Sequence, residues 1–167
     1  FEIDPVVVDM KYVLTDYLGN QITTTNANEI ERYYNANEFI PAVEITNIKT
    51  QSYTYNEETF AVKDDVRIDV SKITGTDYIN YGVPRVKLTI AGDDASNYTF
   101  NGNYGEQTLT SDLYYEINKR PVEIVWDFEN GHHFTYGDET PYLQVKELKN
   151  LVSGEVRTAK VEYYVYE

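Results

Sequence analysis

The chain has 167 residues, of which 41% are hydrophobic and 14% aromatic, enough to bury a core in one or two domains. Its 28 acidic and 14 basic residues give a net charge of -14, which repels nucleic acid and anionic membranes. The absence of cysteine excludes disulfides, zinc–thiolate sites and cysteine nucleophiles, and no apolar run approaches the roughly 20 residues of a membrane span. We therefore expect no nucleic-acid partner and no membrane insertion in this segment.

The N-terminal part of the chain predicts a strand, a turn and one short helical segment. Residues 4–14, "DPVVVDMKYVL", are β-branched and apolar, as in a strand, and Gly19-Asn20 is a turn signal. Residues 24–35, "TTNANEIERYYN", follow with N-cap residues and with Glu29 three positions after Asn26. This segment predicts one or two helical turns and is the only helical candidate.

From Phe39 onward the sequence consists of short segments in which apolar and polar residues alternate. In "RVKLTI", Val86, Leu88 and Ile90 fall on one face, which is typical of a strand covered on one side. Turn clusters separate such segments at intervals of about 8–15 residues. The pattern predicts an all-β fold, an antiparallel, immunoglobulin-like β-sandwich. The alternative is a β-grasp, with residues 26–34, "NANEIERYY", as one helix lying on a curled sheet.

A weak internal repeat indicates two units. The segment around Pro5, "FEIDPVVVDMKYV", matches "YEINKRPVEIVWDF" around Pro121, and a second match aligns Pro41 with Pro141 in the same order. We expect a first β unit at residues 1–118 and a second, truncated unit at residues 119–167. The chain is accordingly expected to be a piece of a longer protein.

Three motifs carry a resemblance to a known family. "NYTF" (97–100), the strand "YYEINKRPVEIVW" (114–126) and "FTYGDETPYLQV" (134–145) resemble the mostly bacterial immunoglobulin-like and YGD-type (MBG) repeat domains of Gram-positive surface proteins. The first unit departs from this pattern, with "YYNANEFIP" in place of the YGD turn. The resemblance implies an extracellular repeat, associated with the cell wall or cell surface, that has no catalytic residues.

The two histidines of the chain, His132 and His133, stand in a loop beside the YGD motif. Adjacent side chains of an extended segment point to opposite sides, and no His-x-His spacing supplies a second metal ligand. We interpret the segment as a structural turn. Its glycine permits an unusual backbone angle, its aspartate caps backbone N–H groups and its proline starts the next strand. The turn residues are Tyr136, Gly137, Asp138 and Pro141.

Other residues are considered as calcium-binding, isopeptide-forming or catalytic sites. The acidic runs at 62–65 and 91–97 lack the spaced ligands of a calcium-binding loop and are interpreted as turns. Strand lysines beside acidic residues raise the possibility of a lysine–asparagine isopeptide bond; these are Lys11, Lys87 and Lys160. No nucleophile or phosphate-binding motif is present, so we expect neither enzyme activity nor a cofactor.

Two functions remain open at this level. The first is a non-catalytic stalk or spacer of an adhesin-like surface protein, whose partners are the neighbouring repeats of the same chain. The alternative is a module that binds a glycan or a host surface protein, either by itself or as an accessory domain of a polysaccharide-degrading enzyme. A binding module predicts three or more exposed aromatic side chains on one face; the candidates are Trp126, Tyr163 and Tyr164.

Overall fold

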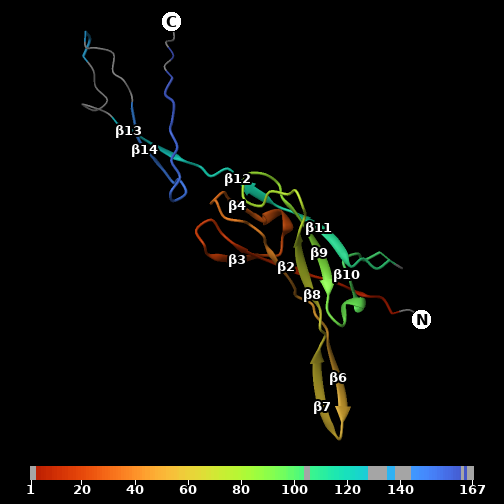
Figure 1. Cartoon of the computed structure of the whole chain (residues 1–167). Coiled ribbons are helices and arrows are strands. Elements are labelled where there is room, and N and C mark those ends of the chain that lie inside the picture. The colour runs from red at the N-terminus through yellow and green to blue at the C-terminus, as the bar shows by residue number, and fades with distance from the viewer. Residues whose placement is uncertain (1–2, 104–105, 128–134, 138–143, 163, 165–167) are drawn as a thin grey trace. The chain divides into compact units, whose positions relative to one another are not determined.

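In the computed structural model the chain forms two compact units, Phe1–Asn118 and Lys119–Glu167, which are described separately (Figure 1). The structure describes residues 3–103, 106–127, 135–137, 144–162 and 164. Almost all regular structure in these residues is β, which confirms the predicted all-β class. Within the described part of the chain, no helix has the length and apolar character needed to cross a bilayer.

Unit 1 contains two three-stranded antiparallel sheets, one two-stranded hairpin and two short parallel pairs. The first sheet has the order β3-β2-β5 and the second the order β11-β9-β8. The strands are β1 (Val6–Val7), β2 (Met10–Thr15), β3 (Gln21–Thr24), β4 (Glu31–Tyr33), β5 (Ala42–Ile45), β6 (Thr50–Tyr55), β7 (Glu58–Lys63), β8 (Arg67–Lys72), β9 (Arg85–Ala91), β10 (Tyr98–Thr99), β11 (Thr110–Tyr114) and β12 (Glu116–Asn118).

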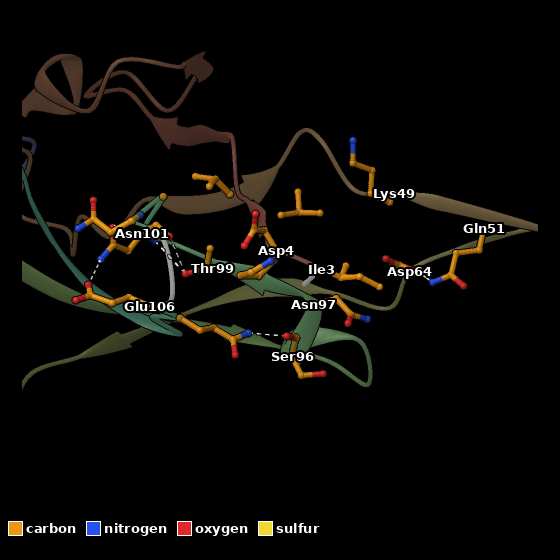
Figure 2. Close-up of a pocket in the computed structure, with 16 residues that line it drawn as sticks. Ile3, Asp4, Lys49, Gln51, Asp64, Ser96, Asn97, Thr99, Asn101 and Glu106 are labelled. Carbon is orange, nitrogen blue, oxygen red and sulfur yellow. Dashed lines mark hydrogen bonds between the residues drawn. The ribbon is translucent and has the colours of Figure 1, made fainter. Parts of the chain in front are cut away.

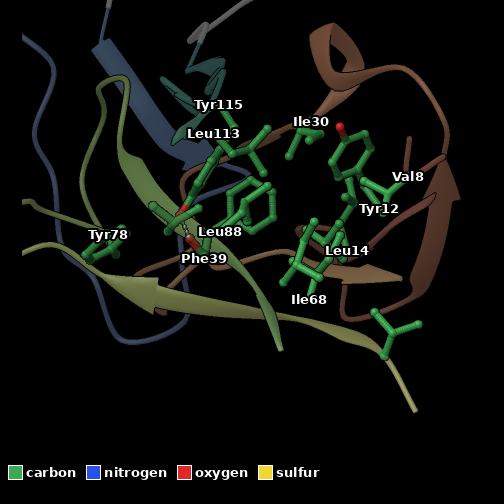
Figure 3. Close-up of a cluster of buried hydrophobic side chains, with 14 of the residues drawn as sticks. Val8, Tyr12, Leu14, Ile30, Phe39, Ile68, Tyr78, Leu88, Leu113 and Tyr115 are labelled. Carbon is green, nitrogen blue, oxygen red and sulfur yellow. Dashed lines mark hydrogen bonds between the residues drawn. The ribbon is translucent and has the colours of Figure 1, made fainter. Parts of the chain in front are cut away.

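The core of unit 1 is formed by the inward side chains of both three-stranded sheets, as in a sandwich (Figure 3). Tyr12 and Leu14 of β2 belong to the same buried cluster as Ile68 of β8 and Leu113 of β11. Each sheet has one apolar face, and joining these faces removes both from water.

Strand β9 confirms the alternation expected in "RVKLTI". Val86, Leu88 and Ile90 are at most 3% exposed, whereas Lys87 between them is on the surface. Because β9 is the central strand of its sheet, its inner face meets neighbours on both sides. That position explains why these three side chains are among the most buried in the chain.

The predicted first strand is divided in two. Strand β1 pairs in parallel with β10, whereas β2 pairs with β3 and β5, so the chain changes sheets between Val7 and Met10. Asn47 holds this change in place: its amide nitrogen donates to Val7 O at 2.8 Å, and its Oδ1 accepts from Asp9 N at 2.9 Å. Change of sheet by one strand is common at the corners of packed sheets.

Two parallel pairs depart from the purely antiparallel arrangement expected. Besides β1 with β10, β12 pairs in parallel with β4, with Ile117 opposite Arg32. Parallel partners require a long connection between them, so this pairing depends on contacts between segments far apart in the sequence. Alternation within one segment does not reveal the direction of its partner.

The predicted helical segment forms a single 3-10 turn, η1 (Ala27–Glu29), before the chain continues as β4. The Asn26 side chain accepts from Asn28 N at 3.0 Å, so the expected capping function is present. Ile30 and Arg32 are then buried as the chain turns into the core. A β-grasp needs a longer helix here, and the structure does not contain one among residues 24–35. A second 3-10 turn, η2 (Ala95–Asn97), precedes β10.

Unit 2 contains one described strand pair, β13 (Glu123–Asp127) with β14 (Gln144–Lys149), antiparallel and with an irregularity between Val125 and Trp126. The pair is closed at its base by Asn150, whose side chain donates to Pro121 O at 2.7 Å. The alternation of "AKVEYYVYE" (159–167) predicts a strand, but the described residues 159–162 form none. A strand needs a backbone partner as well as alternation, and no described segment pairs with these residues.

Candidate functional site

The most exposed regular element of unit 1 is the hairpin formed by β6 and β7, called the hairpin below. Neither strand has a buried residue. Figure 1 shows the hairpin extending away from the three-stranded sheets of its unit. Its tip is a two-residue turn in which Asn56 and Glu57 have φ of 49° and 63°. Two consecutive positive φ values match the turn type whose twist fits an antiparallel hairpin.

The two faces of the hairpin differ in character. Tyr53 lies opposite Phe60, and Gln51 lies opposite Val62, on one face; the other face carries mostly Thr, Ser, Ala and Lys. The Tyr53 and Phe60 rings are stacked, with centroids 5.4 Å apart and an interplanar angle of 22°. We call the four apolar side chains the aromatic face: Tyr53, Tyr55, Phe60 and Val62, all between 40% and 67% exposed.

The base of the hairpin is fixed to the body of unit 1 by Tyr98 in the "NYTF" motif. The Tyr98 side chain is fully buried. Its hydroxyl donates to Oδ2 of Asp64, the residue that follows β7, at 2.7 Å. The same hydroxyl accepts from the backbone N of Lys49, the residue that precedes β6, at 2.9 Å. Burial raises the pKa of the Tyr98 phenol, and the nearby Asp64 carboxylate raises it further. The neutral hydroxyl therefore holds both ends of the hairpin.

The Tyr98→Phe variant tests this attachment. Removing the hydroxyl leaves the Lys49 N–H and one Asp64 oxygen without their partner, which we expect to lower the free energy of unfolding by about 1–3 kcal/mol. Amide exchange in residues 50–63 should accelerate. Guanidinium denaturation and hydrogen exchange measure the two effects. The control is Tyr55→Phe, at a largely exposed tyrosine, and equal effects of the two variants would contradict the attachment.

A groove of about 930 Å³ lies at the base of the hairpin (Figure 2). Its walls are the N-terminal residues 3–7, the hairpin base, and the segments near Asn97 and Asn101. Most of its polar side chains already serve the local structure: Asn101 donates to Glu106 Oε2 at 3.0 Å, and Gln51 donates to Asp64 Oδ1 at 2.9 Å. The groove is therefore a mostly neutral surface with three acidic side chains and one basic side chain, and the residues described in it form no arrangement of nucleophile and base.

The two acidic runs considered for calcium lie against each other. Asp65 N donates to Asp94 Oδ2 at 2.7 Å, and Asp93 N donates to Asp65 Oδ2 at 3.0 Å. These carboxylates cap backbone N–H groups, as in the turn interpretation. No group of three or more His, Asp or Glu side chains within the described residues is placed to hold a metal ion. We call this contact between Asp65 and residues 93–94 the aspartate clasp.

The three lysines considered for an isopeptide bond lie on the surface. Lys11 Nζ is 3.0 Å from Glu44 Oε2, and Lys160 Nζ is 2.7 Å from Glu162 Oε1. Lys87 is exposed on the outer face of β9. An isopeptide bond needs a buried carboxylate beside the lysine, whereas the carboxylates paired with Lys11 and Lys160 are exposed.

The site residues predicted in unit 2 are only partly described. Tyr136 and Gly137 form a turn, in which Gly137 has a φ of +97°. His132, His133, Asp138, Pro141 and Tyr163 lie outside the described residues. Trp126 is 38% exposed on β13, and Tyr164 is 73% exposed.

The aromatic face of the hairpin was not among the candidate sites. A usable signal is present in "SYTYNEETFAV", where aromatic residues alternate on both sides of Asn56-Glu57. Asparagine favours the backbone of a two-residue hairpin turn, and such a turn places Tyr53 opposite Phe60. The sequence of this segment does not indicate whether another part of the chain covers the hairpin.

Comparison with family models, with curated proteins and with solved structures finds no match for this chain.

Proposed function

We propose that this chain is a non-catalytic binding module of an extracellular repeat protein and that the hairpin of unit 1 is its contact element. The supporting observation is that Tyr53, Tyr55 and Phe60 are exposed together on one face of the hairpin. Three exposed aromatics on one face are what a binding module was expected to have. Aromatic side chains provide large contact areas at low entropic cost, and they are enriched at binding interfaces.

The attachment of the hairpin supports the same proposal. A ligand-binding element gains affinity when it is held in place before binding, because less conformational entropy is then lost. Tyr98 supplies such a hold at the hairpin base, and the stacked pair of Tyr53 and Phe60 orders the strands further out. The extracellular, cell-surface location rests on the resemblance of "NYTF" and the YGD motif to surface repeats.

The spacer function is the second candidate. It is favoured by the short connection between the units: β12 ends at Asn118, the last residue of unit 1, and β13 begins at Glu123. Short connections are typical of chains built from successive repeats. A spacer needs no exposed aromatic face, however, so binding is the function that accounts for the hairpin.

Binding to an array of glycans and host matrix proteins tests the proposal. The variant Tyr53→Ser/Phe60→Ser should lose at least about tenfold in affinity for any bound ligand, because it removes the centre of the aromatic face. The variant Trp126→Ser serves as the control for an exposed aromatic in unit 2 and should bind as the parent does. Absence of binding across the array, or binding that depends only on Trp126, would reject the hairpin as the contact element.

A further inference from the structure

The groove and the aromatic face form one continuous surface. Side chains two residues apart along a strand share a face, so Gln51 of β6 lies on the same side as Tyr53. Asp64 lies opposite Lys49, where Asp64 N donates to Lys49 O at 2.9 Å. Lys49, Gln51 and Asp64 all line the groove. The aromatic face therefore leads directly into the groove at the hairpin base, and both can contact one elongated ligand.

The hairpin also offers free backbone hydrogen-bonding groups. Strands β6 and β7 pair only with each other within the described structure, so each has an outer edge without a strand neighbour. Open edges are templates for the addition of a further strand. A strand added there would alternate its side chains between the two faces of the hairpin. At the outer edge of β6, one set would lie beside Tyr53 and Tyr55, and the other beside Ser52 and Thr54.

The charge of this surface specifies the ligand further. Among the described residues that line the groove or lie on this face of the hairpin, acidic side chains outnumber basic ones; the acidic residues are Asp4, Glu58, Asp64 and Glu106, and the basic residue is Lys49. The whole chain carries a net charge of -14. Such a field attracts a cationic partner, and Lys or Arg side chains are also held by tyrosine ring faces.

Two other occupants fit less well. A second copy of this chain would bring the same acidic surface against itself in a two-fold interface, and the like charges would repel. A sugar ring needs an aromatic face turned toward it. The Tyr53 and Phe60 rings, stacked on each other, keep one free face each, but a neutral sugar gains nothing from the negative charge of this surface, whereas a basic segment gains from both.

We propose that this surface binds an extended, basic segment of another protein, which adds as a strand to the outer edge of β6. Its Lys or Arg side chains would lie over the aromatic face, and the small polar residues between them would lie beside Ser52 and Thr54. The proposal rests on the function proposed above and adds the chemical class of the partner.

The probe is a capped octapeptide of alternating arginine and threonine, titrated into the full chain and followed by amide chemical shifts. The shifts should map to residues 50–63 and to the groove. A peptide with glutamate in place of arginine should bind at least about tenfold more weakly. Two further peptides are N-methylated on the backbone. One carries the methyl groups on the backbone amide nitrogens of its arginine residues, and the other on those of its threonine residues. At least one should lose binding, because a strand needs the N–H groups that point to its neighbour.

Variants locate the site. Tyr55→Ser and the double variant Tyr53→Ser/Phe60→Ser should each weaken the arginine peptide, with the body amides of unit 1 unshifted to show that the fold persists. The double variant Asp4→Asn/Glu58→Gln should weaken it in a salt-dependent way. Tyr81→Ser is the matched control, at a tyrosine that is exposed outside the hairpin and the groove.

The outcomes separate the two proposals. Equal binding of the arginine and glutamate peptides, or full binding of both N-methylated peptides, would overturn the basic-strand proposal. Binding of a glycan or an acidic protein that depends on Tyr53 and Phe60 would overturn it as well, while leaving the hairpin as the contact element. If no ligand or peptide binds in a way that depends on the hairpin, both the basic-strand proposal and the proposed binding function are rejected.

Discussion

Replacing Phe39 by alanine is expected to lower the free energy of unfolding of unit 1 by about 3–5 kcal/mol. Phe39 is 1% exposed, and its ring packs edge-on against Tyr115 with centroids 5.2 Å apart. The Arg32 guanidinium lies over the ring, with Cζ 4.5 Å from its centroid. Truncation removes both interactions and leaves a cavity that the neighbouring side chains fill only in part.

The surroundings of Phe39 make its loss costly. The Tyr115 hydroxyl donates to Phe39 O at 2.6 Å, and burial raises the pKa of this phenol. Arg32 donates to Asn37 O at 2.7 Å and to Glu38 O at 3.0 Å, immediately before Phe39. Displacement of this backbone would therefore disturb hydrogen bonds of two largely buried polar side chains, which stabilise the packed state only while their partners are in place.

Guanidinium denaturation followed by far-ultraviolet circular dichroism measures the effect. The matched control is Phe60→Ala on the hairpin, where the ring is 40% exposed and the loss should be below about 1 kcal/mol. Similar losses for the two phenylalanines would contradict the assignment of Phe39 to the core and of Phe60 to an uncovered face.

The second large effect is expected for Gly92→Ala, at roughly 3 kcal/mol of destabilisation. Gly92 has a φ of +114°, and a Cβ at this position would lie 2.3 Å from Asp65 O and 2.9 Å from Asp65 C. Both atoms belong to the backbone, so no side-chain rotation relieves the contact. The clash adds to the cost of a backbone angle that residues with a side chain rarely adopt.

The damage from Gly92→Ala should reach the hairpin. Asp65 belongs to the aspartate clasp and directly follows Asp64, whose carboxylate accepts the hydrogen bond from the Tyr98 hydroxyl. We therefore expect faster amide exchange in residues 50–63 as well as a lower denaturation midpoint. Gly75→Ala is the matched control, because Gly75 has a φ of +86° but no atom within 4 Å of the added Cβ. If Gly75→Ala lowered the free energy of unfolding as much as Gly92→Ala does, the backbone angle alone, without the clash, would set the cost.

Local patterns predicted much of the fold correctly. Alternation identified β9 and its inner residues because period two is a property of any strand with one covered face. The capping residues around Asn26 were also real, yet they close only a 3-10 turn before Ile30 enters the core. Local capping does not determine how far a helix continues when the following residues are needed elsewhere in the packing.

The sequence by itself determined the all-β class, the acidic surface and the exclusion of cysteine chemistry, since these follow from composition and from contacts between near neighbours. The tertiary structure decided which strands pair in parallel, that Asp65 and Asp94 meet, and that Tyr98 attaches both ends of the hairpin. It also decided that the aromatic alternation of "SYTYNEETFAV" stays uncovered. A strand with apolar residues on one face looks the same in sequence whether another sheet covers that face or not, because covering depends on segments far away in the chain.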